Sequence, residues 1–126
     1  METTLTKVVR IVLGACLLFF GLNKFFHFFT PPPHSEAAGV FLGGLASSGY
    51  FFPMLGIIEA GTGLALVLGL YVPLALLVLA PVSLNIVLFH LFLDPGGIMT
   101  GAVMGLMLAY LGWAYRESYA QLFKAR

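Results

Sequence analysis

Residues 50–93 read YFFPMLGIIEAGTGLALVLGLYVPLALLVLAPVSLNIVLFHLFL, and this stretch decides the fold. Among Asp, Glu, Lys and Arg it contains a single residue, Glu59. An α-helix needs about 20 mostly apolar residues to cross the ~30 Å hydrocarbon core of a bilayer, and the stretch holds two such runs. The short link between them ends at Pro73, a residue favoured at a helix start. We therefore predict two consecutive transmembrane helices, over about residues 50–70 and 73–93.

Apolar runs on either side predict two more spans, over about residues 5–29 and 98–115. Three prolines, at positions 31–33, follow the first run and cannot continue its helix. After them, Ser35 resembles an N-cap and opens an apolar pattern of helical period. The predicted fold class is therefore all-α: a polytopic four-transmembrane-helix bundle forming a single membrane domain. A short amphipathic surface helix, over about residues 35–48, lies between the first and second spans.

The composition excludes a water-soluble protein. Hydrophobic residues make up 60% of the chain and charged residues 9%, and the mean hydropathy is +1.02. A soluble domain is typically about 25% charged, and a fold this small has too little interior to hide so much apolar surface. Lipid is therefore the expected solvent and partner. The net charge of +1, with no basic tract, argues against a nucleic-acid partner.

Basic residues at the two ends of the chain predict its orientation. Lys7 and Arg10 open the first span, and Arg116, Lys124 and Arg126 follow the fourth. Because loops and tails rich in Lys and Arg stay in the cytoplasm, both termini are expected there. The predicted location is the cell (inner) membrane, which the chain crosses as a multi-pass protein.

The single cysteine, Cys16, excludes an internal disulfide and any paired-cysteine metal site. Residues 13–16 resemble a lipoprotein cleavage box. However, the apolar run that follows Arg10 has only three residues, 11–13, before Gly14, whereas a signal peptide needs about 7–15 before its cleavage site. We expect Cys16 to be an uncleaved and buried packing residue.

Polar side chains are concentrated in the half of the bundle away from the termini. Ionisable residues inside a membrane are costly, which makes each a candidate functional residue. We predict that Lys24 pairs with Glu59, with Asn85 directed inward and His90 at the edge. The predicted ligand-binding pocket, for which no catalytic or metal-binding residue is assigned, comprises Asn23, Lys24, Glu59, Asn85 and His90. Alternatively, these residues only hold the helices together by hydrogen bonds, which contribute about 0.6–2 kcal/mol each.

Small residues recur every four positions on two spans, a pattern that lets helix backbones approach closely in lipid. We predict tight helix packing at Gly61, Ala65 and Gly69 of the second span and at Gly97, Gly101, Gly105 and Ala109 of the fourth.

Several motifs resemble the DoxX family of small membrane proteins. They are Gly21-Leu22-Asn23-Lys24-Phe25-Phe26, residues 48–53 (SGYFFP) and Glu59-Ala60-Gly61. The resemblance covers nearly the whole chain and implies a four-helix membrane bundle. The family takes its name from a subunit associated with a quinone-reducing thiosulfate oxidoreductase. It therefore implies an accessory subunit of a quinone-linked redox system, with a redox protein as partner, quinone as the ligand and no covalently bound cofactor.

Two other functions stay open, and so does whether the chain is an enzyme. With one cysteine and no haem- or flavin-binding motif, the chain could not move electrons alone. It could instead be a non-catalytic membrane assembly or interaction protein, either with another membrane protein or as a homo-oligomer. A small transporter is less favoured, because the sequence shows neither an internal repeat nor a pair of broken helices.

Overall fold

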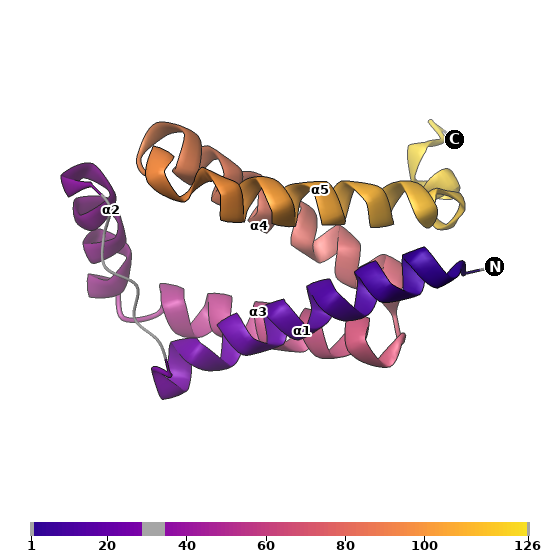
Figure 1. The fold of residues 1–126 in the computed structure, drawn as a ribbon, viewed down its shortest axis with the longest axis horizontal. Helices are drawn as coiled ribbons and strands as arrows, with labels where there is room; N and C mark the ends of the chain where they lie inside the picture. Colours follow the sequence, from indigo (N-terminus) through magenta and orange to yellow (C-terminus); the bar gives the residue numbers. More distant parts are fainter. Residues whose placement is uncertain (1, 29–34, 126) are drawn as a thin grey trace.

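The computed structural model describes residues 2–28 and 35–125, and every regular element in them is helical. Within these two ranges, four helices are long and apolar enough to cross a membrane, and a shorter apolar helix lies between the first two. This confirms the predicted fold class. The elements, shown in Figure 1, are α1 (Thr4–Phe26), α2 (Glu36–Ser47), α3 (Phe51–Leu68), α4 (Val72–Phe92), η1 (Pro95–Gly97), α5 (Ile98–Ala114) and η2 (Arg116–Phe123).

Local sequence explains where the helices begin and end. Ser35 caps α2 as predicted: its Oγ accepts a hydrogen bond from the backbone N–H of Ala38 at 3.0 Å. Gly69 ends α3 with a φ of 73°, a left-handed conformation that costs glycine nothing. Tyr71 is also left-handed, with a φ of 53°, and Pro73 follows in the first turn of α4. The two left-handed residues reverse the chain within a very short link.

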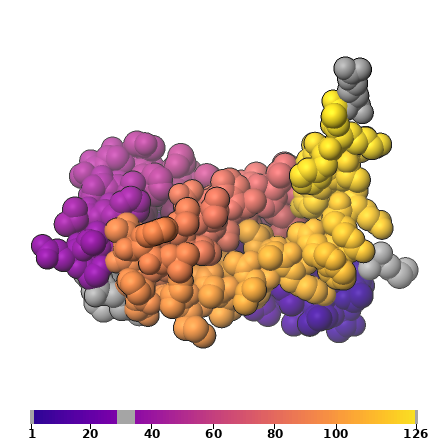
Figure 2. Space-filling model, turned by 90° about the horizontal axis from the view of Figure 1, so that it is seen from above, coloured from indigo at the N-terminus to yellow at the C-terminus, as the bar shows by residue number. Residues whose placement is uncertain are grey.

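The helices form two antiparallel pairs, α1 with α3 and α4 with α5. In Figure 1 the pairs lie close together at the end of the bundle where both chain termini lie, which we call the termini end. At the opposite end they diverge, and α2 lies across that end, which we call the α2 end. Figure 2 shows α4 and α5 running side by side, with α2 at one extremity and the C-terminal segment at the other.

The closest helix contact joins α1 to α3 through four glycines. Gly14 and Gly21 on α1 meet Gly63 and Gly56 on α3, with a seven-residue spacing on each helix. A Cβ atom added to Gly21 would lie 2.5 Å from the backbone nitrogen of Ala60. One added to Gly63 would lie 2.6 Å from a backbone nitrogen of α1. The two backbones therefore touch, and a larger residue at Gly14, Gly21 or Gly63 would push them apart.

The predicted glycine stripes fared differently. Gly97, at the end of η1, and Gly101 of α5 accommodate the ring of His90, and Gly105 faces a valine of α4, so the stripe packs as expected at its three glycines. Its fourth member, Ala109, is exposed, which corrects the prediction there.

On α3 the prediction is wrong at Gly61, which has no atom within 4 Å of the position of an added Cβ. Ala65 packs against the buried core, and Gly69 lies against the Arg10 guanidinium. At ~100° per residue, Gly61 lies about 160° around the helix from Gly63, and α3 turns the Gly63 side to α1.

Cys16 is exposed, which corrects the prediction that it is buried. Helix α1 packs through Gly14 and the fully buried Leu13 and Leu17. Cys16 lies about 100° from Leu17 around the helix, at the edge of the face that packs against the bundle. The rest of the core is equally apolar, with Leu66 and Leu111 also fully buried.

The glycine contact predicts a contrast between two substitutions on neighbouring helices. Gly21→Ala should lower the free energy of unfolding by about 1–3 kcal/mol, because the added methyl group pushes two backbones apart. Gly61→Ala should be neutral or stabilising by up to about 1 kcal/mol, since its methyl enters open space and alanine favours helix. Thermal unfolding of both purified variants in one detergent measures the difference. Equal effects would contradict the assigned interface.

Candidate functional site

Lys24 of α1 and Glu59 of α3 form an ion pair within the membrane-spanning part of the bundle. The ammonium Nζ lies 2.8 Å from the carboxylate Oε1, and Glu59 is buried. The Gly21–Gly56 contact lies directly beside the pair: a Cβ added to Gly56 would approach the Lys24 Cβ to 3.2 Å. The close approach of the two backbones thus brings the two charges into contact.

The two partners of this pair are not equally enclosed. The Glu59 side chain is 4% exposed, whereas that of Lys24 is 20% exposed. An ammonium has three N–H bonds, and among the described residues two acceptors lie near it, Glu59 and the Phe20 carbonyl oxygen at 3.4 Å. Lys24 therefore has both the exposure and the donor capacity to bind a further acceptor.

Asn23 precedes Lys24 on the last turn of α1 and is partly buried. Its backbone carbonyl accepts a hydrogen bond from the N–H of His27 at 2.8 Å, which ends the helix. Asn23 thus lies beside the ion pair, as its place in the sequence requires. A role for Asn23 in binding stays a prediction.

Asn85 does not point inward as expected, because it lies on an exposed face of α4. Its side-chain Nδ2 donates to the carbonyl oxygen of Pro81, one turn earlier in the same helix, at 2.9 Å. A hydrogen bond within its own helix lets an amide face lipid without a partner on another helix. The structure therefore does not place Asn85 at the Lys24–Glu59 pair.

His90 packs between α4 and α5, whereas we predicted it at the edge of the polar pocket. Its Nδ1 lies 2.8 Å from the carbonyl oxygen of Ile86, and because a carbonyl only accepts, Nδ1 carries the proton. The ring fills the space left by Gly97 and Gly101. The described contacts of His90 are thus with the start of α5, and the structure does not bring it to Lys24 and Glu59.

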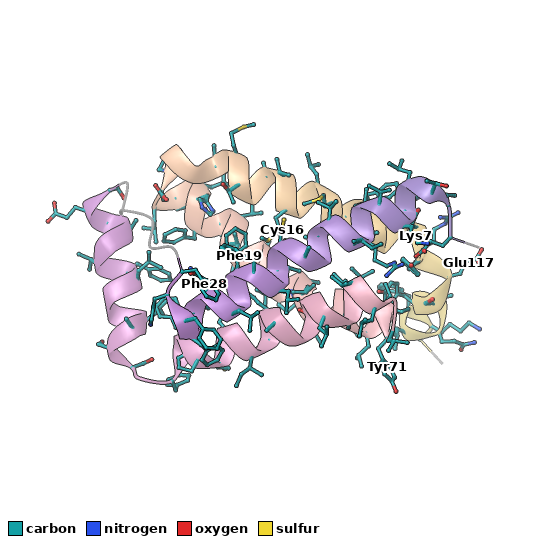
Figure 3. All side chains as sticks on the ribbon, turned by 60° about the horizontal axis from the view of Figure 1, so that its bottom comes forward. Lys7, Cys16, Phe19, Phe28, Tyr71 and Glu117 are labelled. Carbon is teal, nitrogen blue, oxygen red and sulfur yellow. The ribbon has the colours of Figure 1, made fainter. Side chains whose placement is uncertain are left out.

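An open groove runs between α1 and α5, with a volume of about 350 Å³. Its walls are apolar apart from Cys16 and Thr100. Figure 3 shows Cys16 on the side of α1 that faces α5. The α1 wall ends at Phe20, whose carbonyl oxygen is the one near the Lys24 ammonium. The groove and the ion pair are therefore adjacent along α1.

A second polar cluster closes the termini end, and sequence reasoning did not anticipate it. The buried Arg10 guanidinium donates to the carbonyl oxygen of Leu66, in the last turn of α3, and to that of Val67 at 3.4 Å. Its Nε donates to Glu2 Oε2 at 2.8 Å. A cation is favourable at the negative end of a helix dipole, so Arg10 caps the C-terminal end of α3. In the sequence, Arg10 indicates only the orientation of the chain, although Glu2 is its nearest acidic residue.

Tyrosines of the C-terminal part extend this cluster. The Tyr115 hydroxyl donates to Glu2 Oε2 at 2.5 Å, and the Tyr119 hydroxyl donates to the Pro73 carbonyl oxygen at 2.7 Å. Hydrogen bonds from Tyr115 and Arg10 lower the pKa of the Glu2 carboxyl. Burial, together with the bond to Glu2, raises the pKa of Tyr115 to about 12. The cluster therefore ties the N-terminal segment to the end of α5 and the C-terminal segment to the start of α4.

The fold defines a class, a small multi-pass membrane protein built from two helix pairs that are tied at one end and diverge at the other. Within that class, the family model DoxX matches residues 5–91, and the chain belongs to the DoxX family. The matched part contains both partners of the Lys24–Glu59 pair. No curated protein and no solved structure matches the chain.

The ion pair predicts strong coupling between two substitutions. Glu59→Leu alone leaves a partly buried ammonium without its carboxylate, and breaking a buried pair in this way typically costs about 3–5 kcal/mol. Adding Lys24→Met removes the stranded charge, so the double variant should be more stable than Glu59→Leu. Thermal unfolding of the two single variants and the double variant tests this. Additive effects would show that the pair contributes nothing.

The Glu2–Tyr115 bond predicts a specific response to alkaline pH. The folded-state pKa of Tyr115 is raised from 10.0 to about 12, so its stabilising effect is complete below pH 10 and is lost as the pH rises towards 12. Tyr115→Phe should be less stable at neutral pH by about 1.5–3 kcal/mol, because a hydrogen bond to a charged group is lost. Its unfolding temperature should also fall less steeply between pH 10 and 12. Tyr50→Phe, at an exposed tyrosine, is the control and should show the same pH dependence as the wild type. If the unfolding temperature of Tyr115→Phe falls as steeply as that of the wild type, the assignment is contradicted.

Proposed function

We propose that this DoxX protein is an accessory subunit of a quinone-linked redox system and that Lys24 holds the quinone headgroup. The observation that carries the proposal is the Lys24–Glu59 pair: a charged pair kept inside a membrane-spanning bundle, with the carboxylate enclosed and the ammonium one-fifth exposed. Intramembrane charges are expensive and mark ligand or proton sites in many membrane proteins. The carbonyl oxygens of a quinone are acceptors that an exposed ammonium can bind.

The residues beside the pair fit such a ligand. The Lys24 ammonium offers a donor, and the apolar groove begins at Phe20, one helical turn away. A bound quinone would supply an acceptor for two electrons and two protons, and a partner redox protein would supply the electrons. The Glu59 carboxylate, 2.8 Å from the Lys24 ammonium, compensates its charge inside the bundle and fixes its position.

The proposal includes an orientation. Figure 1 shows both chain termini at the same end of the bundle, and the basic residues Lys7, Arg116 and Lys124 belong to the segments there. We place this end in the cytoplasm of a cell-membrane protein. The Lys24–Glu59 pair then lies toward the outer surface, on the side that α2 crosses.

The amount of quinone that co-purifies with the protein tests the proposed function. The wild type, purified from bacterial membranes, should retain quinone that solvent extraction and mass spectrometry detect. Lys24→Met/Glu59→Leu removes the ammonium without leaving the carboxylate unpaired. This double variant should retain at least about tenfold less quinone, since a hydrogen bond to a charged group is worth about 1.5–3 kcal/mol. Lys7→Met, at an exposed lysine on the same helix, should retain the wild-type amount. Equal amounts in all three proteins, or quinone in none, would contradict the function.

A further inference from the structure

The groove between α1 and α5 has one closed end and one open end. At the termini end, the hydroxyl groups of Thr6 and Tyr110 lie 2.9 Å apart and join the two helices. Tyr115 and Glu2 add a second tie just beyond them. The helices separate toward the α2 end, as Figure 1 shows, and the groove lies along this divergence. The shape of the groove is therefore a consequence of the fold, because hydrogen bonds hold α1 and α5 together at the termini end and the two helices diverge toward the α2 end.

The α1 wall of the groove points toward the ion pair. Leu13, Cys16 and Phe20 recur at intervals of three and four residues, which places them on one stripe of the helix. The next positions of that stripe are Asn23 and Lys24. An apolar channel that runs toward a cation suits an amphiphile, with its chain in the groove and its polar head at the ammonium.

The chemistry of the site selects the kind of head. Glu59 lies 2.8 Å from the Lys24 ammonium, so a second anion, such as a lipid phosphate, would meet a buried carboxylate of like charge. A neutral head with acceptor oxygens avoids this repulsion and can still accept a hydrogen bond from Lys24. The pair therefore favours a neutral carbonyl compound over an anionic phospholipid.

The groove itself suits a flexible hydrocarbon chain. Its volume of about 350 Å³ lies within the range of about 300–1,000 Å³ that is typical of small-molecule sites. Met99, Met104 and Met107 form part of the α5 wall, and methionine side chains adapt to irregular apolar partners. The groove is open on its outer side, so a chain can enter sideways from the bilayer.

From these observations we infer that the groove between α1 and α5 binds the isoprenoid chain of the quinone whose headgroup Lys24 holds. This inference rests on the proposed function and extends it by assigning the second half of the ligand. The headgroup contact gives chemical selectivity, and the chain contact gives apolar burial of about 25 cal/mol per Å². Quinones with a chain should therefore bind more tightly than the same headgroup without one.

A photoreactive ligand tests the position of the chain. The probe is a benzoquinone with a ten-carbon chain that ends in a diazirine, added to the full-length protein in phosphatidylcholine nanodiscs. After illumination, crosslinks located by peptide mass spectrometry should concentrate on residues 13–20 and 99–107. An excess of the unlabelled ten-carbon quinone should suppress them at least tenfold, whereas the headgroup without a chain should be a weaker competitor.

Matched variants at one helix supply the control. Cys16→Phe places a large ring in the groove and should reduce these crosslinks at least fivefold. Val12→Phe, at an exposed apolar position of α1 outside the groove lining, should leave them unchanged. Crosslinks spread over the exposed helix faces, or insensitive to Cys16→Phe, would overturn the inference.

The outcome also separates this inference from the proposed function. If co-purified quinone depends on Lys24 but the chain crosslinks elsewhere, the groove assignment fails and the function stands.

A second probe carries the same chain and diazirine on a simple alcohol. If it crosslinks in the groove as strongly as the quinone probe, and if the Lys24→Met/Glu59→Leu variant binds both equally, the groove accepts any alkyl chain. That result would overturn the assignment to quinone.

Discussion

The backbone contact between α1 and α3 is the constraint on which the rest of the structure depends. In lipid the hydrophobic effect does not drive helices together, so close van der Waals packing must do so, and glycine allows the closest packing. Gly14 and Gly21 against Gly63 and Gly56 fix both the distance and the register of the two helices. The same register brings Lys24 to Glu59 near one end and Arg10 to the last turn of α3 at the other. Four glycines thus position three charged side chains that the bilayer would otherwise expel.

The two ends of the bundle are stabilised in different ways. At the termini end, Arg10, Glu2 and three tyrosines form hydrogen bonds that join the N-terminal segment, the α3–α4 link and the C-terminal segment. At the α2 end the helix pairs diverge, and the contacts with α2 include Phe41 against Phe89 and Ser35 Oγ donating to the Leu93 carbonyl oxygen at 2.5 Å. A tied end and a divergent end give the bundle a rigid base and an accessible region, which is the arrangement that a binding site in the membrane requires.

The sequence was sufficient to predict the four helices, the extra helix and the capping role of Ser35, because length, hydropathy and capping chemistry act locally. It also indicated that Lys24 needs Glu59, since lone charges at that depth are costly. The rotation of each helix about its axis could not be predicted in the same way. A helix that is apolar all round carries no stripe that marks its inner face, and α4 is such a helix. The orientations of Asn85, His90 and Gly61, and the exposure of Cys16, depend on that rotation. Arg10 was recognised as a charge, but its acceptors are backbone carbonyls, which no side-chain pattern reveals.

The unequal enclosure of the ion pair connects the fold to the proposed site. Glu59 lies against the glycine contact, where two touching backbones leave it 4% exposed, so the fold holds it fixed. Lys24 lies three residues past Gly21, in the last turn of α1, and is 20% exposed. This turn belongs to the end of the bundle at which the helix pairs diverge. A buried carboxylate compensates the charge of the ammonium, and the divergence of the helices keeps the ammonium accessible. Were the glycines replaced by larger residues, α3 would move away and Lys24 would lose its carboxylate. Were the helices parallel along their whole length, Lys24 would be enclosed like Glu59. The site therefore requires both close contact on one side of α1 and separation on the other.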